Sequence, residues 1–181
     1  CLIFQIFTHL IVLLGYMGCG KSLIGDALAK HLDIEFIDLD YYIVKHENQS
    51  IKTIFKEGGE LKFRKLEHNY LLDIIQNKGN VVVALGGGTP CYFNTMDQFK
   101  KQPKIKTIYL RSELNTLVDR LWKERLHRPM IAHLKTKESL AEFIGKHLFE
   151  RNFYYEQAET KVDTDLKSVD EIVTEVFSLL G

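Results

Sequence analysis

This chain contains few prolines and few cysteines, and it has no surplus of positive or negative charge. Its 181 residues include three prolines and three cysteines, and 24 lysines and arginines balance 24 aspartates and glutamates. An odd number of cysteines without metal-ligand spacing (Cys1, Cys19 and Cys91) argues against a disulfide framework and favours a reducing, cytoplasmic location. Balanced charge produces no field that attracts nucleic acid or an anionic membrane, so we expect neither as a partner.

Long apolar runs are lacking as well. No run approaches the ~20 residues that cross a bilayer. Residues 1–14 are apolar like the core of a signal peptide, but no basic segment precedes them and their second half is needed as a strand. We therefore interpret residues 1–8 as a fragment start or an upstream extension. An apolar content of 45% suits a monomer with one domain over residues 1–181, since single domains usually have about 100–200 residues.

One glycine-rich stretch, residues 15–22 (GYMGCGKS), matches the phosphate-binding pattern G-x-x-x-x-G-K-[ST] and is called the phosphate loop below. A β-prone segment, residues 10–14, precedes it, and apolar residues at helical spacing follow it. Its glycines let backbone N–H groups surround phosphate oxygens, Lys21 would reach the β- and γ-phosphates, and Ser22 would ligate Mg²⁺. The sequence thus predicts an ATP site that comprises Gly15, Gly18, Cys19, Gly20, Lys21, Ser22 and Leu23.

Strand-like and helical patterns alternate along the rest of the chain. The predicted strands are residues 10–14, 35–40, 81–85, 107–110 and 161–163, and the predicted helices are 41–79, 112–122, 138–159 and a last one that Ser168 and Glu171 open as a capping box. Residues 123–137 are charged and broken by Pro129, which indicates a mobile segment. The alternation predicts an α/β fold with a parallel sheet covered by helices on both faces.

Paired aspartates are the candidates for the acid that a phosphate loop needs to hold Mg²⁺. Asp38 and Asp40 close one predicted strand, where they would share a face at the ligand-binding edge of the sheet. We assign Asp38 to Mg²⁺ through water and Asp40 to an acceptor hydroxyl. The runner-up is the pair Asp163 and Asp165, which we interpret as a turn near the nucleotide base.

A second run of glycines, residues 86–88 (the glycine triplet), follows a buried strand. Three glycines provide no packing, so close approach of the backbone to an acceptor is the preferred reading, and a plain turn into Pro90 is the alternative. Guanidinium groups suit a carboxylate-bearing acceptor and a transferring phosphoryl group. Arg64, Arg128 and Arg151 are candidates, but the pattern alone does not separate them from the other arginines.

Taken together, these motifs resemble the shikimate kinase family from about Leu10 to the C-terminus. The resemblance rests on the phosphate loop, Asp38-Leu39-Asp40, Ile54-Phe55, Phe63-Arg64, the glycine triplet, Arg128-Pro129-Met130, and Arg151 with Tyr155. It implies a three-layer fold like that of nucleoside monophosphate kinases, with five parallel strands in the order 2-3-1-4-5. It also implies a substrate-binding region at about residues 41–79 and a lid at about 123–137.

The same resemblance implies ATP-dependent phosphorylation of the 3-hydroxyl group of shikimate, a step towards chorismate and the aromatic amino acids. The implied acceptor site is Asp40, Phe55, Phe63, Arg64, Gly86, Gly87, Gly88 and Arg151. The implied catalytic residues are Lys21, Asp40 and Arg128, with Arg120 and Arg128 added to the ATP site and Ser22 and Asp38 at Mg²⁺. Arg120 would stack on the adenine, and Arg64 and Arg151 would clamp the carboxylate.

Two other functions stay open at this point. The first is another small-molecule kinase with a phosphate loop, of the gluconate or nucleoside monophosphate type. The second is a nucleotide-regulated binding module that has no acceptor, although Asp38, Asp40 and Arg128 argue against it.

Overall fold

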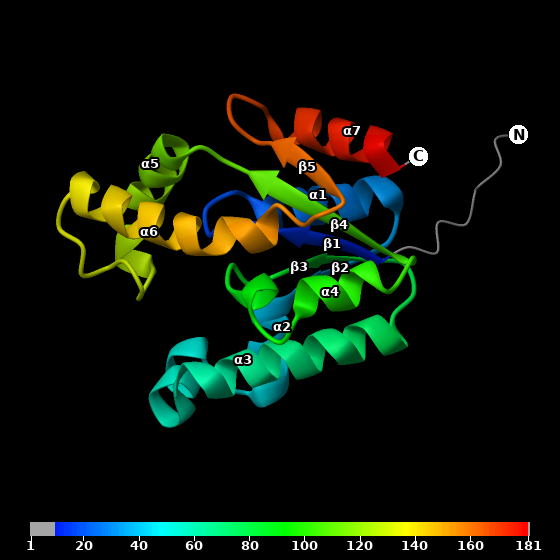
Figure 1. Ribbon diagram of the computed structural model, residues 1–181, viewed down its shortest axis with the longest axis horizontal. Helices are drawn as coiled ribbons and strands as arrows, with labels where there is room; N and C mark the ends of the chain where they lie inside the picture. Colours follow the sequence, from blue (N-terminus) through cyan, green and yellow to red (C-terminus); the bar gives the residue numbers. More distant parts are fainter. Residues whose placement is uncertain (1–9, 181) are drawn as a thin grey trace, which may run out of the picture.

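A five-stranded parallel sheet lies between two layers of helices in the computed structural model, which describes residues 10–180 (Figure 1). The strands are β1 (Leu10–Leu14), β2 (Glu35–Asp38), β3 (Val81–Ala84), β4 (Ile105–Arg111) and β5 (Thr160–Asp163). Their order, β2-β3-β1-β4-β5, confirms the predicted topology. The segment interpreted as a fragment start or an extension, residues 1–8, lies outside the described residues.

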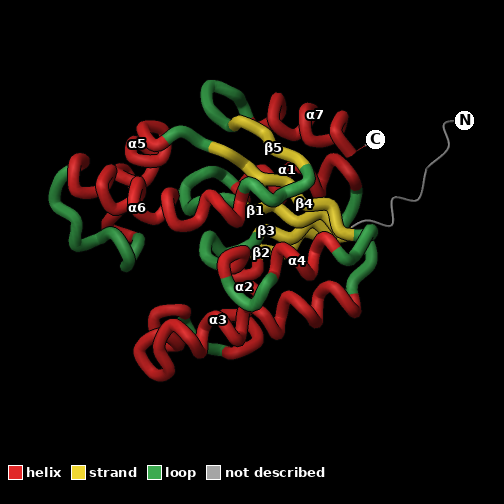
Figure 2. Tube along the Cα trace, viewed as in Figure 1, coloured by secondary structure: helices red, strands yellow, loops and turns green. Residues whose placement is uncertain are grey.

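Seven α-helices surround the sheet in the described part of the chain (Figure 2). They are α1 (Lys21–Leu32), α2 (Leu39–Glu47), α3 (Ile51–Asn77), α4 (Thr95–Lys100), α5 (Leu114–Glu124), α6 (Lys137–Tyr155) and α7 (Val169–Leu180), with short 3-10 helices at Thr89–Cys91 and Arg125–His127. Helices α1 and α7 pack together on one side of the sheet, and α3 and α4 lie on the other (Figure 1). Between residues 10 and 180, no helix has the length and apolarity to cross a membrane.

The central strand β1 positions the phosphate loop. Every residue of Leu10–Leu14 is buried, because helices cover both faces of the strand, and this explains its uninterrupted apolar sequence. Its neighbours are β3 and β4, with Leu13 opposite Ala84 and Ile108. Since β1 and β3 are parallel, the phosphate loop and the glycine triplet leave the sheet side by side at the same edge.

The prediction that residues 35–40 form one strand is wrong at its end. Strand β2 stops at Asp38, and α2 begins at Leu39. The Asp38 side chain accepts a hydrogen bond from the Tyr41 N–H, so it caps the helix, as aspartate often does. Asp40 therefore reaches the ligand edge from the first helical turn and not from a shared strand face.

Other boundaries follow the predicted alternation with small shifts. The helix expected over residues 138–159 is α6, which ends at Tyr155, and α4 was not predicted. The segment 123–137 breaks into the 3-10 helix Arg125–His127 and turns, as Pro129 suggested. Ser168 and Glu171 form the predicted capping box, with backbone-to-side-chain hydrogen bonds in both directions.

A packing test of this architecture is available at Gly25, which is buried where α1 crosses the sheet. A Cβ atom there would lie 2.5 Å from a ring carbon of Phe36 and 3.2 Å from a methyl group of Leu13. We predict that Gly25→Val lowers the free energy of unfolding by about 1–3 kcal/mol through overpacking, measured by urea denaturation. Gly79→Val is the matched control because nothing lies within 4 Å of its Cβ position. Equal stability of the two variants would contradict this packing.

Candidate active site

The phosphate loop has a backbone that glycine makes possible. Gly15, Gly18 and Gly20 adopt φ values of +143°, +82° and +100°, which side chains with a Cβ rarely adopt. A Cβ at Gly15 would also lie 2.6 Å from the carbonyl oxygen of Leu110 on β4. Helix α1 begins at Lys21, so its free N–H groups end in the loop and favour an anion there.

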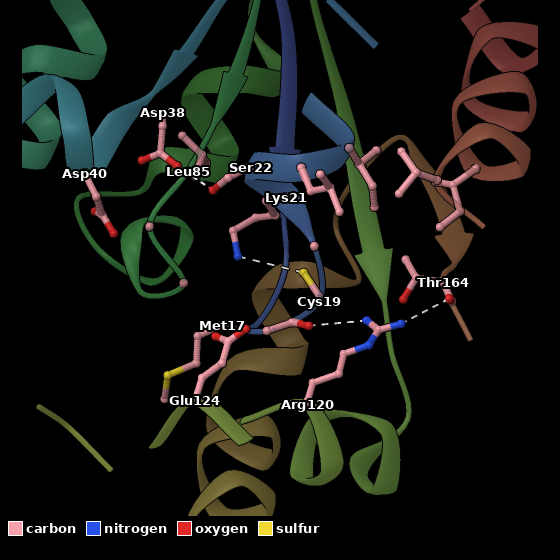
Figure 3. Close-up of a pocket in the computed structure, with 18 of the residues that line it drawn as sticks. Met17, Cys19, Lys21, Ser22, Asp38, Asp40, Leu85, Arg120, Glu124 and Thr164 are labelled. Atoms are coloured by element: carbon pink, nitrogen blue, oxygen red, sulfur yellow. Dashed lines mark hydrogen bonds between the residues drawn. The ribbon is translucent and has the colours of Figure 1, made fainter. Parts of the chain in front are cut away.

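A cleft of about 580 Å³ opens at this loop. It is lined by residues 17–24 and by residues from four other parts of the chain, including Asp38, Asp40, Gly86, Gly87, Arg120 and Arg128. Figure 3 shows Asp38 and Asp40 on one side of this space, Arg120 on the other, and Lys21 between them. Leu23, another predicted ATP-site residue, lines the same cleft from α1.

The buried ammonium group of Lys21 donates hydrogen bonds to the carbonyl oxygens of Gly15 (2.8 Å) and Tyr16 (3.0 Å). The Cys19 thiol is buried beside it, 3.8 Å from Nζ. The next residue of α1 is Ser22, whose Oγ donates to Asp38 Oδ2 at 2.5 Å (Figure 3). The loop thus presents a cation and a pair of oxygen ligands to one space.

Asp40 has an unusual carboxyl group. Its Oδ1 is buried without a hydrogen-bond partner and would lie 3.0 Å from a Cβ at Gly86. Burial raises its pKa to about 6, and the negative charges of Glu67 and Asp38 add to this, whereas the positive charges of Lys21 and Arg64 oppose it. An unpartnered buried oxygen with a raised pKa is typical of a group that acts on a ligand.

The glycine triplet makes room for charged side chains. None of its residues has a left-handed φ, so the requirement is space. A Cβ at Gly88 would overlap the guanidinium group of Arg64, and one at Gly86 would overlap Oε1 of Glu67. The plain-turn reading is therefore insufficient, and close approach to protein charges accounts for two of the three glycines.

Arg64 lies against Gly88 of the triplet, and all three nitrogens of its guanidinium group donate to protein carboxylates. Nη1 donates to Glu67 Oε2 (2.5 Å), and Nε and Nη2 donate to Glu60 Oε1 (3.2 and 3.1 Å). The ring of Tyr92 lies 4.9 Å from its Cζ. Sequence reasoning missed Glu60 and Glu67, although their spacing of four residues before and three after Arg64 on one helix was a usable signal.

The remaining predicted acceptor residues are Phe55, Phe63 and Arg151, of which Arg151 lies beside the triplet. Phe55 and Phe63 have ring centroids 4.8 Å apart, with Phe63 buried. Arg151 on α6 has Nη1 3.6 Å from a Cβ position at Gly87, and its Cζ lies 5.6 Å from the Tyr16 ring. The Tyr155 hydroxyl donates to the Gly87 carbonyl oxygen. Helix α6 therefore reaches both the triplet and the phosphate loop.

One further contact joins α6 to the phosphate loop. The Tyr16 hydroxyl lies 3.0 Å from His147 Nδ1, across 131 residues of sequence. His147 is one turn before Arg151, so this hydrogen bond fixes the part of the helix that carries the arginine. Burial lowers the pKa of His147, and the Arg151 charge lowers it further.

Two arginines occupy the other wall of the cleft. Arg120 Nη1 donates to the Gly18 carbonyl oxygen (3.3 Å) and Nη2 to that of Thr164 (3.5 Å), which joins the phosphate loop to the segment after β5. Arg128 donates from Nε and Nη2 to Glu124 (3.0 and 2.6 Å). Both line the cleft, and sequence reasoning did not anticipate the partner of Arg128.

The alternative aspartate pair is engaged elsewhere. Asp163 forms an ion pair with Arg111 (2.5 Å), and Asp165 accepts the Glu113 N–H (2.9 Å). Neither residue lines the cleft, whereas Thr164 between them does. The geometry thus favours Asp38 as the acid beside Ser22.

These electrostatics can be tested without substrate. We predict that Asp40 titrates with a pKa of about 6. Asp38→Asn removes a negative neighbour and should lower this pKa, whereas Lys21→Met removes a positive one and should raise it. Carboxyl ¹³C NMR titration measures all three proteins. Asp26→Asn, which changes a surface partner of Lys30, is the control without effect, and a wild-type Asp40 that titrates near 4 would contradict the analysis.

Comparison with known proteins agrees with this geometry. The sequence profile of the shikimate kinase family matches residues 17–180. Shikimate kinases of Flavobacterium johnsoniae and Flavobacterium psychrophilum are 46% and 42% identical to the chain, each covering 94% of it and 98% of their own length. The crystal structure of shikimate kinase from Bacteroides thetaiotaomicron superimposes with a TM-score of 0.88 at 34% identity, over 95% of this chain and 98% of that one. The chain therefore belongs to the shikimate kinase family.

Proposed function

We propose that the protein transfers the γ-phosphoryl group of ATP to the 3-hydroxyl group of shikimate, a step in the synthesis of aromatic amino acids. The observation that carries this proposal is a single cleft that brings the phosphate loop to Asp40, whose buried Oδ1 has no protein partner. Relatives that match almost the whole chain are named shikimate kinases, which supports the choice of acceptor.

ATP would bind with its phosphates in the phosphate loop and its adenine towards Arg120. Three loop glycines with left-handed φ leave backbone N–H groups free to surround phosphate oxygens, and Lys21 is within the same cradle. Arg120 bridges the loop and Thr164, which places its planar group at the far end of the cleft, where a base can stack.

The residues present suit Mg²⁺ at Ser22 and Asp38. Their oxygens are 2.5 Å apart and line the cleft, and hard oxygen ligands are those that Mg²⁺ prefers. Residues 10–180 contain no cluster of three or more His, Cys, Asp or Glu suited to a metal, so most ligands would come from water and ATP, as is usual for this ion. Asp38 would act through water, and bound Mg²⁺ supplies neutralisation of phosphate charge.

Shikimate would lie between Asp40 and the glycine triplet. Arg64 and Arg151 converge on the triplet from α3 and α6, which suits a carboxylate held by two guanidinium groups. Phe55 and Phe63 would flank the ring, and backbone groups of the triplet would meet its hydroxyls. We treat residues 41–79 as the substrate-binding region on this basis.

In phosphoryl transfer, positioning and charge stabilisation do most of the work. Asp40 would orient the 3-hydroxyl group and take its proton late; a pKa of about 6 leaves it ionised at neutral pH yet more basic than an ordinary aspartate. Lys21 and Arg128 would neutralise charge on the transferring group. Arg128 must then exchange Glu124, which lies in the same segment, for a phosphate oxygen. We propose that residues 123–137 move as a lid that carries Arg128 to the γ-phosphate.

We also infer that the protein acts as a monomer in the cytoplasm. One chain supplies every residue of the proposed site, and Cys19 and Cys91 are both free thiols, which suits a reducing compartment.

The function is tested by ADP formation from ATP in a coupled assay. We expect ADP to form only when both shikimate and Mg²⁺ are present. Asp40→Asn keeps the shape of the side chain but accepts no proton, so kcat should fall by about 10²–10⁴. ADP formation that ignores shikimate, or normal turnover by a folded Asp40→Asn protein, would refute the proposal.

The carboxylate clamp is tested separately by Arg64→Ala. We expect KM for shikimate to rise by at least about tenfold, because a bidentate charged pair is lost, while KM for ATP stays unchanged. Arg111→Ala is the matched control, since Arg111 is an exposed arginine paired with Asp163 away from the cleft. Equal effects of Arg64→Ala on both KM values would argue against the clamp.

A further inference from the structure

Arg64 is held by two protein carboxylates at the place where a ligand carboxylate would bind. Glu60 Oε1 accepts from both Nε and Nη2, at 3.2 and 3.1 Å, and so fills one side of the guanidinium fork. Glu67 Oε2 accepts from Nη1 at 2.5 Å and restricts the other. Three of the five N–H groups are thus engaged, and Glu60 takes both donors of the Nε–Nη2 edge, so a ligand carboxylate that binds bidentately at this edge must displace Glu60.

The two glutamates are held very differently. The Glu67 side chain is 1% exposed and also accepts the Thr89 hydroxyl at 2.6 Å. The Glu60 side chain is 55% exposed, and within residues 10–180 its one other hydrogen bond comes from the Tyr92 hydroxyl at 3.0 Å. Removing Glu67 from Arg64 would strand a buried acid, whereas Glu60 can turn into water. Glu60 is therefore the partner that can be displaced.

The backbone at Glu60 also permits a change. Gly59, which precedes it, has φ +69° and ψ −176°, so the helical conformation of α3 is interrupted there. Nothing lies within 4 Å of the Gly59 Cβ position. Glu60 is thus the first residue after a break between two helical stretches, and not part of a continuous rigid helix.

The positive charges near Glu60 are those of the arginines that would bind the acceptor carboxylate. Burial raises its pKa, but hydrogen bonds from Tyr92 and Arg64 and the charges of Arg64 and Arg151 lower it, and the net change is downward. The Glu60 carboxylate therefore stays ionised and is attracted by the same two arginines that would clamp the acceptor.

We propose that Glu60 is an internal substitute for the acceptor carboxylate: it holds Arg64 until that carboxylate displaces it. This role rests on the proposed function. Glu60 then determines affinity, because every acid that binds must first replace it, which weakens apparent binding. It also determines specificity, because a neutral analogue cannot compete for Arg64.

The test is binding of shikimate to Glu60→Gln, measured by isothermal titration calorimetry, together with KM for shikimate. Glutamine keeps the hydrogen-bonding shape but removes the competing charge, so we expect Kd and KM to fall by about 3- to 10-fold while KM for ATP stays unchanged. Glu57→Gln, an exposed glutamate 3.9 Å from Lys62 on the same helix, is the matched control and should change neither.

Two comparisons make the result specific. The methyl ester of shikimate lacks the anionic group, so Glu60→Gln should not improve its binding. Tyr92→Phe removes the other hydrogen bond of Glu60 and should lower Kd for shikimate in the same direction by a smaller factor.

The outcomes separate this role from the proposed function. If the wild-type protein phosphorylates shikimate but Glu60→Gln binds it no more tightly, or improves acid and ester equally, the role of Glu60 is wrong and the kinase function stands. If the wild-type protein neither binds nor phosphorylates shikimate, the proposed function fails, and the role of Glu60 fails with it.

Discussion

Burial of opposite charges at one edge of the sheet is the constraint on which the rest of this structure depends. Lys21, Arg64 and Glu67 are each less than 10% exposed, and Asp40 has a fully enclosed oxygen beside them. Isolated charges in such surroundings cost several kcal/mol each, so they persist only as a balanced group. Burial raises the pKa values of Asp40 and Glu67, and the positive charge of Arg64 opposes this rise in both.

The glycines at this edge of the sheet leave room for these buried charged side chains. Gly86 and Gly88 lie where any Cβ would overlap Glu67 or Arg64, so even alanine would force an ionic side chain out of position. Gly15 and Gly18 act differently, since their φ values shape the loop itself. The two glycine runs meet because β1 and β3 are adjacent parallel strands. The phosphate loop provides the backbone that would surround an anion, and the glycine triplet would let the acceptor approach that anion.

The features that could be predicted from the sequence are those that neighbouring residues determine. The phosphate loop is a continuous pattern flanked by a strand and a helix, and it was recognisable from the residues alone. The strand order came from the family resemblance, because single-sequence patterns do not say which strands are neighbours. The end of β2 was misread because Asp38 looks equally like a strand-end acid and a helix cap, and only the Tyr41 N–H decides between them.

Contacts between residues that are far apart in the sequence could not be predicted from it. The hydrogen bond between Tyr16 and His147 joins residues 131 positions apart, and no pattern in either segment announces it. Glu60 and Glu67 lie at helical spacing from Arg64, which is a signal for ion pairs on one helix, but this spacing does not distinguish a ligand-binding arginine from one paired on a helix surface. Family membership, and not residue patterns, decides against a gluconate kinase or a binding module.

Three of the cations proposed to meet anionic ligands share one property: each already has a protein acceptor. Lys21 is bound to two carbonyl oxygens of the phosphate loop, Arg128 to Glu124, and Arg64 to Glu60 and Glu67. Without these acceptors, partly buried cations would be left unpaired, which is more costly than any single hydrogen bond is favourable. Ligand binding is then an exchange of partners, and its net free energy is the difference between two similar interactions. Such a difference keeps affinity moderate, so that a product with both a carboxylate and a phosphate group can leave a site that contains several cations.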